Sequence, residues 1–360
     1  MVTFDVAVCN RMGVHLMLLC VGLLLLEGRA SPGVPPGCNS PEAVRVAEDA
    51  LHQVNQDRIS GYVWSLNRLY DVARTTEQNK GVLYKLTIDV LATNCHVISK
   101  KPWKDCSIRD IGDIPAYGEC EVVAYFDTEV ILQSYSCAVR EVLATAVVRD
   151  CPDCPTADSL DDPIVKETAR LSLLKFNQDS SLANYFSLEN ITMASYQWIV
   201  VGPAYNVDFT IVETVCSKTT DPSELGLCPP MDCQFAHKGF CQGSHYPTED
   251  EFEFQNPVGT KQLSRQSSVT VKCEIYEPQA SKEEEQAHVT AGQGHTEHQD
   301  HNHTHLHSHE HTHTHSASNG TKAPGPKGIV ENRPAAPRSA PSASSCPGVH
   351  RHKGLVRFTT

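Results

Sequence analysis

The short run Cys151-Pro152-Asp153-Cys154-Pro155 combines residue types that can present an acid on a rigid loop. A disulfide between Cys151 and Cys154 would close a very small ring, in which Pro152 fixes one backbone angle and Pro155 stiffens the exit. Asp153 would then lie at the tip of an exposed turn. A carboxylate ordered in this way can ligate a metal that another protein leaves open, such as the catalytic zinc of a protease, and displace the water that the metal activates.

The same five residues allow other interpretations. A redox dithiol would need a surrounding β-α-β pattern, and half of a zinc site would need a second Cys-x-x-Cys, neither of which the sequence has. A purely structural staple needs no further residues, although so short a ring contributes only about 2 kcal/mol in the chain-entropy model. The residues alone leave the staple and the zinc ligand as open alternatives.

Histidine occupies every second position of a tract near the C-terminus. Imidazoles at this spacing offer ligands to zinc or copper, but no cysteine lies among them to complete a closed tetrahedral site. We therefore expect weak, multivalent metal binding and no other cofactor, with a solvated spacer as the alternative. The tract comprises His301, His303, His305, His307, His309, His311, His313 and His315.

The N-terminal segment has the pattern of an export signal. Arg11 precedes the apolar run Val14 to Leu26, and Gly28-Arg29-Ala30 supplies the small residues of a cleavage site, so we expect a signal peptide over residues 1–30 that starts at Met1 or Met12. The run is too short to span a bilayer comfortably, and a membrane anchor is the weaker alternative. Three glycosylation sequons agree with a secreted, extracellular glycoprotein, at Asn190, Asn302 and Asn319.

The overall charge and the absence of catalytic motifs limit the possible functions. A formal net charge of −13 argues against nucleic-acid binding and against adhesion to anionic membranes. The chain has no Ser-His-Asp order, no paired catalytic carboxylates and no phosphate loop. We expect a monomer that acts by binding and is not an enzyme.

The cysteines record an internal duplication. Val54-Asn55-Gln56-Asp57 recurs as Phe176-Asn177-Gln178-Asp179, and three cysteines recur with offsets of 121, 122 and 121 residues. Fifteen cysteines occur, and thirteen remain after the signal, so one is left over. The repeat suggests local pairs within each copy and leaves Cys38 and Cys346 as outliers that can tie the tail to the first copy. Cys233 is then the spare cysteine, and two alternatives stay open: it is free, or it competes with Cys228 for Cys216. The expected pairs are Cys38–Cys346, Cys95–Cys106, Cys120–Cys137, Cys151–Cys154, Cys216–Cys228 and Cys241–Cys273.

Each copy is expected to open with a helix and to continue in strands. Ser40-Pro41 and Asp162-Pro163 supply the cap and the first turn of the two helices. Segments rich in β-branched and aromatic residues follow, which predicts an α+β fold with each helix packed across an antiparallel sheet. The predicted strands include 82–91, 122–125, 130–135, 201–215 and 269–276. The expected organisation is a first domain over 38–150, a linker over 151–155, a second domain over 156–277 and a disordered tail over 278–360.

Several segments together give the chain a resemblance to the fetuin family of the cystatin superfamily. Cys346-Pro347-Gly348 is similar to the family's C-terminal cysteine region. The resemblance covers about residues 38–273 together with Cys346. The other segments that carry it are Gly61 to Arg68, Leu86 to Leu91, Cys95 to Cys106, Cys151 to Pro155 and Gln197 to Pro203.

The resemblance implies two tandem cystatin-like domains in a secreted glycoprotein that inhibits astacin-type zinc metalloproteases. In that case Asp153 ligates the zinc of the target, a hairpin of the second domain fills the cleft, and the protein restrains premature egg-coat hardening at fertilisation. The implied hairpin residues are Gln197, Trp198, Ile199, Val200, Val201, Gly202 and Pro203.

Two departures from the family qualify this implication. The run Gln197 to Gly202 is one residue longer than the Gln-x-Val-x-Gly hairpin of cystatins that block papain-like proteases, so inhibition of cysteine proteases is not expected. The alternative function is that of a mineral- or metal-binding plasma carrier, as in fetuin-A-like relatives. Glu119, Glu121 and Asp127 would then supply acidic groups on a sheet face.

Overall fold

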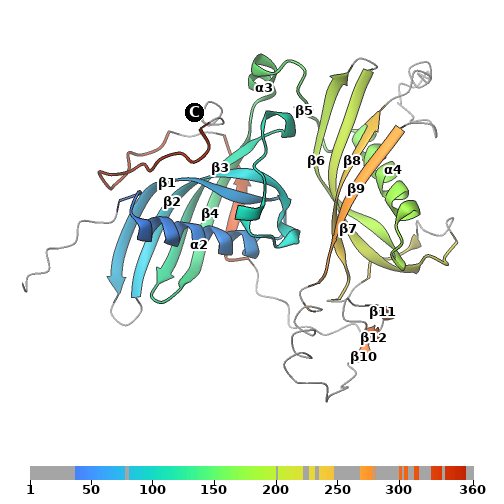
Figure 1. Ribbon diagram of the computed structural model, residues 1–360, viewed down its shortest axis with the longest axis horizontal. Helices are drawn as coiled ribbons and strands as arrows, with labels where there is room; N and C mark the ends of the chain where they lie inside the picture. Colours follow the sequence, from blue (N-terminus) through green and yellow to red (C-terminus); the bar gives the residue numbers. More distant parts are fainter. Residues whose placement is uncertain are drawn as a thin grey trace, which may run out of the picture.

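The computed structural model describes residues 37–77, 81–199, 202–221, 227–231, 235–246, 268–278, 280, 300–301, 304–306, 312–315, 326–334 and 337–353. Two units, each a helix on an antiparallel sheet, lie side by side (Figure 1). The predicted α+β class is therefore confirmed. None of the helices in these ranges has the length and apolar character that crossing a bilayer requires.

The first unit forms where the sequence predicts it. The Ser40 hydroxyl accepts a 3.1 Å hydrogen bond from the Ala43 N–H and so caps helix α2. Alanine, valine and leucine side chains of α2 are buried against the sheet, whose antiparallel strands follow in chain order. The elements are α2 (Pro41–Asp57), β1 (Tyr62–Glu77), β2 (Gly81–His96), β3 (Ala116–Phe126) and β4 (Val130–Glu141), with short 3₁₀ helices η1 (Val97–Ser99), η2 (Trp103–Asp105) and η3 (Ile111–Asp113) between β2 and β3.

The second unit repeats this plan. The Asp162 carboxylate accepts a 2.9 Å hydrogen bond from the Ile164 N–H and caps helix α4. Its sheet has the strand order β5-β6-β7-β8-β9. The elements are α3 (Ala144–Asp150) ahead of the linker, then β5 (Thr156–Ala157), α4 (Pro163–Asp179), β6 (Asn184–Ile199), β7 (Gly202–Ser217), β8 (Lys238–Tyr246) and β9 (Ser268–Tyr276).

Six disulfides staple the described residues, and they join the same cysteines that the sequence analysis paired. One of them links Cys38 to Cys346 across 308 positions of the chain. Cys233, the signal segment, Asn302 and Asn319 lie outside the described residues. The other five disulfides are Cys95–Cys106, Cys120–Cys137, Cys151–Cys154, Cys216–Cys228 and Cys241–Cys273.

The expectation of a wholly disordered tail is wrong for its last described part. Strand β13 (Gly328–Asn332) pairs in parallel with β4, with Val330 opposite Cys137. An exposed strand edge carries unpaired N–H and C=O groups, and β13 satisfies those of β4. Short strands β10 (Asp300–His301), β11 (Thr304–Leu306) and β12 (Thr312–His315) pair with one another further upstream.

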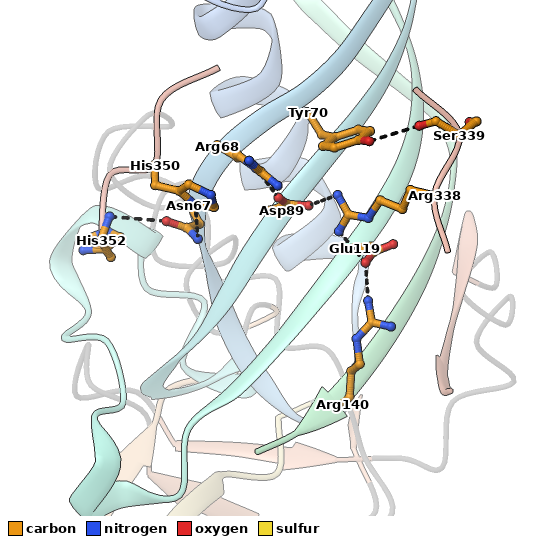
Figure 2. A network of polar contacts seen from close by, with 10 residues as sticks. All are labelled: Asn67, Arg68, Tyr70, Asp89, Glu119, Arg140, Arg338, Ser339, His350 and His352. Atoms are coloured by element: carbon orange, nitrogen blue, oxygen red, sulfur yellow. Dashed lines mark hydrogen bonds and ion pairs between the residues drawn. The ribbon is translucent and has the colours of Figure 1, made fainter. Parts of the chain in front are cut away.

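Residues 337–353, called here the C-terminal arm, cross from β13 over the first sheet to its opposite edge. Figure 2 shows Arg338 between Asp89 on β2 and Glu119 on β3. Beyond it, the N–H of Gly348 donates to the carbonyl of Leu69 on β1 at 2.8 Å. The tail thus covers both edges of the first sheet, which composition alone did not indicate because the contacts join residues more than 190 positions apart.

Candidate functional site

The first domain anchors the linker through α3. The N–H of Cys151 donates a 2.8 Å hydrogen bond to the carbonyl of Val147, so the linker continues directly from the last turn of this helix. Val147 and Val142 are buried together, and Cys154 packs against them. The start of the linker is therefore fixed to a small apolar cluster of the first domain.

The second domain anchors the other end of the linker. Strand β5 follows the Cys-Pro-Asp-Cys-Pro run immediately and pairs with β6, with Thr156 opposite Tyr196. The N–H of Asp158 adds a 2.9 Å hydrogen bond to the carbonyl of Ala194. Because both ends are held within a few residues, the loop between them has little freedom to rearrange.

The disulfide ring lies between these two anchors. Cys151 and Cys154 are bonded, with their Cα atoms 5.3 Å apart, and the N–H of Cys154 donates to the carbonyl of Cys151 at 3.1 Å. Pro152 and Asp153 are exposed. The side-chain amide of Gln197 donates a 2.5 Å hydrogen bond to the main-chain carbonyl of Asp153, and no donor among the described residues contacts its carboxylate. The acid is presented to solvent while its backbone is held.

The hairpin that the sequence predicted for this site is formed by β6 and β7. Ile199 pairs with Gly202, whose φ of +126° is a backbone angle that glycine adopts easily. Trp198 is 69% exposed although it is a large apolar residue. Val200 and Val201 lie outside the described residues, and Pro203 pairs with Trp198. The hairpin and the ring meet through Gln197.

Exposed apolar side chains flank the ring, and none of them was predicted as a site residue. Leu143 is 74% exposed at the start of α3, and Val148 on the same helix is 44% exposed. Tyr196, next to Gln197, is 43% exposed. Such side chains gathered around one loop are typical of a protein-binding surface. The apolar run after Glu141 was the available signal for α3 and its exposed residues.

Strands β8 and β9 reach the same end of the second domain as the tip of the β6–β7 hairpin. Tyr205, close to the β6–β7 tip, pairs with His245, close to the end of β8. Strand β8 therefore ends, and its partner β9 begins, at that same end, where Tyr246 pairs with Ser268. The inserted residues between them lie outside the described residues. In Figure 1, α3, β5 and the ends of β6 and β7 also lie at this end.

Buried contacts fix the two domains to one another. The Tyr62 hydroxyl of β1 donates a 2.6 Å hydrogen bond to Asp208 of β7, and the Arg109 guanidinium lies 3.8 Å from the same carboxylate. Burial raises the pKa of Asp208, while Tyr62 and Arg109 favour its charged form. His96 stacks on Phe240 with ring centroids 5.1 Å apart, and burial lowers the pKa of His96 to about 4. The neutral imidazole therefore acts as an aromatic contact, and the interface keeps the linker and the hairpins in one orientation.

Other predicted site residues lie elsewhere. Asn190 is exposed on β6, as a glycosylation acceptor must be. Glu119 faces Arg140 and Arg338 on the first sheet (Figure 2). The side chains of the His tract lie outside the described residues, and the described part of the chain contains no cluster of three or more potential metal ligands.

Comparison with known proteins agrees with the repeated helix-on-sheet plan. The cystatin domain family matches residues 33–128 and 154–248, which defines the class as a tandem cystatin-domain protein. Fetuin-B of Bos taurus is 35% identical over 285 residues, which are 75% of this chain and 68% of the relative. The chain belongs to the fetuin-B family, and its membership agrees with the expectation that it is not an enzyme.

Two solved complexes of a relative show the same architecture. Mouse fetuin-B in complex with crayfish astacin has a TM-score of 0.53 and 35% identity, over 68% of this chain and 74% of that chain. The inhibitory complex of human meprin beta with mouse fetuin-B has a TM-score of 0.55 and 36% identity, over 69% and 76%.

Proposed function

We propose that the protein is a secreted inhibitor of astacin-type zinc metalloproteases and that the carboxylate of Asp153 ligates the zinc of the target enzyme. The observation that carries this proposal is the position of Asp153, exposed on a disulfide ring that both domains anchor. A carboxylate is an ordinary zinc ligand, and its arrival at the open position displaces the water that the enzyme needs for hydrolysis.

The anchoring of the ring should raise the affinity for the protease. Association costs conformational entropy for every segment that becomes ordered, and a loop that is ordered beforehand avoids part of that cost. The ring also resists the extended backbone that a protease requires for cleavage. Exposed Trp198 and the second-domain hairpin then fill the cleft beside the zinc, and Leu143 and Val148 extend the contact on the other side of the ring.

The relatives support the class of target. Mouse fetuin-B forms a complex with astacin and an inhibitory complex with meprin beta. The disulfides and the sequons support secretion. Prevention of premature egg-coat hardening at fertilisation is the physiological role that we propose on the basis of the family. Any metal binding by the His tract is a separate and weaker property.

An inhibition assay with matched variants tests this proposal. Asp153→Ala should weaken inhibition of an astacin-family protease at least about 100-fold, which corresponds to roughly 2.7 kcal/mol, because the zinc loses its ligand. The melting temperature should not change, because the side chain is exposed. Asp161→Ala removes another exposed acid, eight residues further along the chain, and should inhibit as the unchanged protein does.

The outcomes distinguish zinc ligation by Asp153 from protease inhibition by the protein as a whole. Full inhibition by Asp153→Ala would exclude zinc ligation by this residue. Failure of the unchanged protein to inhibit an astacin-family protease would exclude the function itself, and papain serves as the comparison enzyme. Inhibition of papain alone would place the protein with the inhibitors of cysteine proteases.

The alternative of a mineral carrier has less support in the structure. Glu119 lies between two arginines, so its charge is already compensated within the protein. Glu121 and Asp127 are exposed but are single acids. Solubilisation of calcium phosphate by Asp153→Ala, in a preparation that no longer inhibits the protease, would favour this alternative.

A further inference from the structure

A cavity of about 400 Å³ lies beside the C-terminal end of α2. The loop after α2 forms one wall, and the first sheet continues it at Trp64 and Tyr135. Thr192 and Met193 of β6 close it from the second domain, and β13 borders it with Val330 and Asn332. Its size falls within the usual range of small-molecule sites, roughly 300–1,000 Å³. None of the proposed inhibitory residues lines it.

Arg58 gives this cavity a buried positive charge. The residue is 6% exposed, and its guanidinium stacks on Trp64 with the central carbon 3.6 Å from the ring centroid. Burial lowers the pKa of Arg58 to about 9, so the group is charged at neutral pH. A second arginine of the wall, Arg109, already faces Asp208, whereas no carboxylate among the described residues lies within ion-pair distance of Arg58.

The hydrogen bonds of Arg58 reach only neutral oxygens. One terminal nitrogen donates to the carbonyl of Tyr62 at 2.7 Å and to the side-chain oxygen of Asn55 at 3.4 Å, and the other donates to the carbonyl of Ser60 at 3.3 Å. The Nε–H is buried and has no acceptor among the described residues. This nitrogen is closed off from the cavity, but a buried positive charge whose partners are all neutral is costly unless an anion compensates it. The arrangement therefore favours a negatively charged partner inside the cavity.

The other side chains of the cavity wall indicate the chemistry of the uncharged part of that partner. Trp64, Tyr62 and Tyr135 supply aromatic surface, and Ile114, Val139 and Met193 supply aliphatic surface. Such walls bind a flat apolar ring, and a single charged group fixes its orientation. We propose that this cavity is a binding site for a small aromatic carboxylate or sulfonate, with the anionic group at the Arg58 guanidinium.

Calorimetric titration of the full-length protein with 2-naphthoate tests this site, and the neutral amide of the same shape, 2-naphthamide, is the matched ligand. We expect saturable binding of one naphthoate per chain and at least about tenfold weaker binding of the amide, because a charge-assisted hydrogen bond is lost. Arg58→Gln should remove the preference for the acid.

Two variants on β13 make the test independent of Arg58, which also stabilises the loop after α2. Val330→Trp places a large side chain at the cavity border and should weaken naphthoate binding at least about tenfold. Ile329→Trp makes the same change at the neighbouring exposed position, which does not line the cavity, and should leave binding unchanged. Absence of saturable binding, equal affinity for acid and amide, or unchanged binding by Val330→Trp would each overturn the proposal.

Discussion

The side-chain amide of Gln197 donates a 2.5 Å hydrogen bond to the main-chain carbonyl of Asp153. Gln197 belongs to the second-domain hairpin, and Asp153 belongs to the ring between the domains. The contact therefore connects the two parts of the proposed inhibitory surface while the carboxylate of Asp153 is left exposed.

We expect Gln197→Ala to weaken inhibition about three- to tenfold. The variant loses one net hydrogen bond, roughly 0.5–1.5 kcal/mol, and the ring becomes less ordered before binding. Inhibition constants against an astacin-family protease measure the effect. Gln133→Ala, at an exposed position of the first domain, is the control. Equal inhibition by both variants would show that the ring is ordered without this contact.

We expect Tyr62→Phe to loosen the contact between the domains. The buried carboxylate of Asp208 loses a 2.6 Å hydrogen bond, and bonds to charged groups contribute about 1.5–3 kcal/mol. Thermal unfolding should begin at a lower temperature, and inhibition should weaken because the linker and the hairpins are no longer held together. Tyr70→Phe removes an exposed hydroxyl contact to Ser339 and should change neither quantity. A stable, fully inhibitory Tyr62→Phe would contradict this role of the interface.

We expect Arg338→Met to destabilise the first domain by about 1–3 kcal/mol. Asp89 and Glu119 are mostly buried carboxylates on neighbouring strands, and Arg338 contacts both of them. Chemical denaturation measures the loss, and hydrogen exchange should locate it in β2, β3 and the C-terminal arm. Arg333→Met alters an exposed pair with Glu331 and is expected to have little effect. Similar stability of the two variants would mean that the ion pairs of Asp89 with Arg68 and of Glu119 with Arg140 are enough to stabilise these acids.

We expect His237→Gln to lower stability more at pH 5.5 than at pH 8.5. Burial opposes a charge on the imidazole, but Glu213 and Glu277 raise the pKa of His237 above its ordinary value of 6.5. This stabilisation is complete below the pKa of the unfolded chain and is lost as the pH rises through the folded-state pKa.

The pKa of Glu213 sets the lower limit of the pH range in which its contact with His237 stabilises the fold. Burial opposes its charge, yet the contacts with His237 lower the pKa of Glu213 below 4.5, so its stabilisation is lost as the pH falls through that lowered value. Melting temperatures across this range measure the effect, with His52→Gln on α2 as the control. A difference between wild type and His237→Gln that does not depend on pH would contradict the assignment.

The helices and several strands were predictable because their signals are local. Ser40 and Asp162 cap the helices as expected, and the β-branched runs lie in strands. Strand β1 gave no such signal, because its register shifts between Leu66 and Arg68 and again between Leu69 and Asp71. These irregularities break the alternation of apolar and polar residues on which a sequence pattern depends.

The site was predictable in part. Cysteine spacing indicated the ring, since Cys151 and Cys154 have no counterpart in the repeat. The hydrogen bond of Gln197, the exposed positions on α3 and the crossing of Arg338 over the first sheet depend on contacts between distant segments. A single sequence contains no local pattern for such contacts.

The disulfide between Cys38 and Cys346 has a consequence for the histidine tract. The tract lies between β9 and β13 in the chain, and both strands belong to folded sheets, so the segment that contains it is attached to a sheet at each end. A single cut anywhere within it would release no fragment, because the C-terminal piece would remain covalently joined to the first domain. Such nicking would therefore be visible on a reducing gel and would escape detection on a non-reducing one.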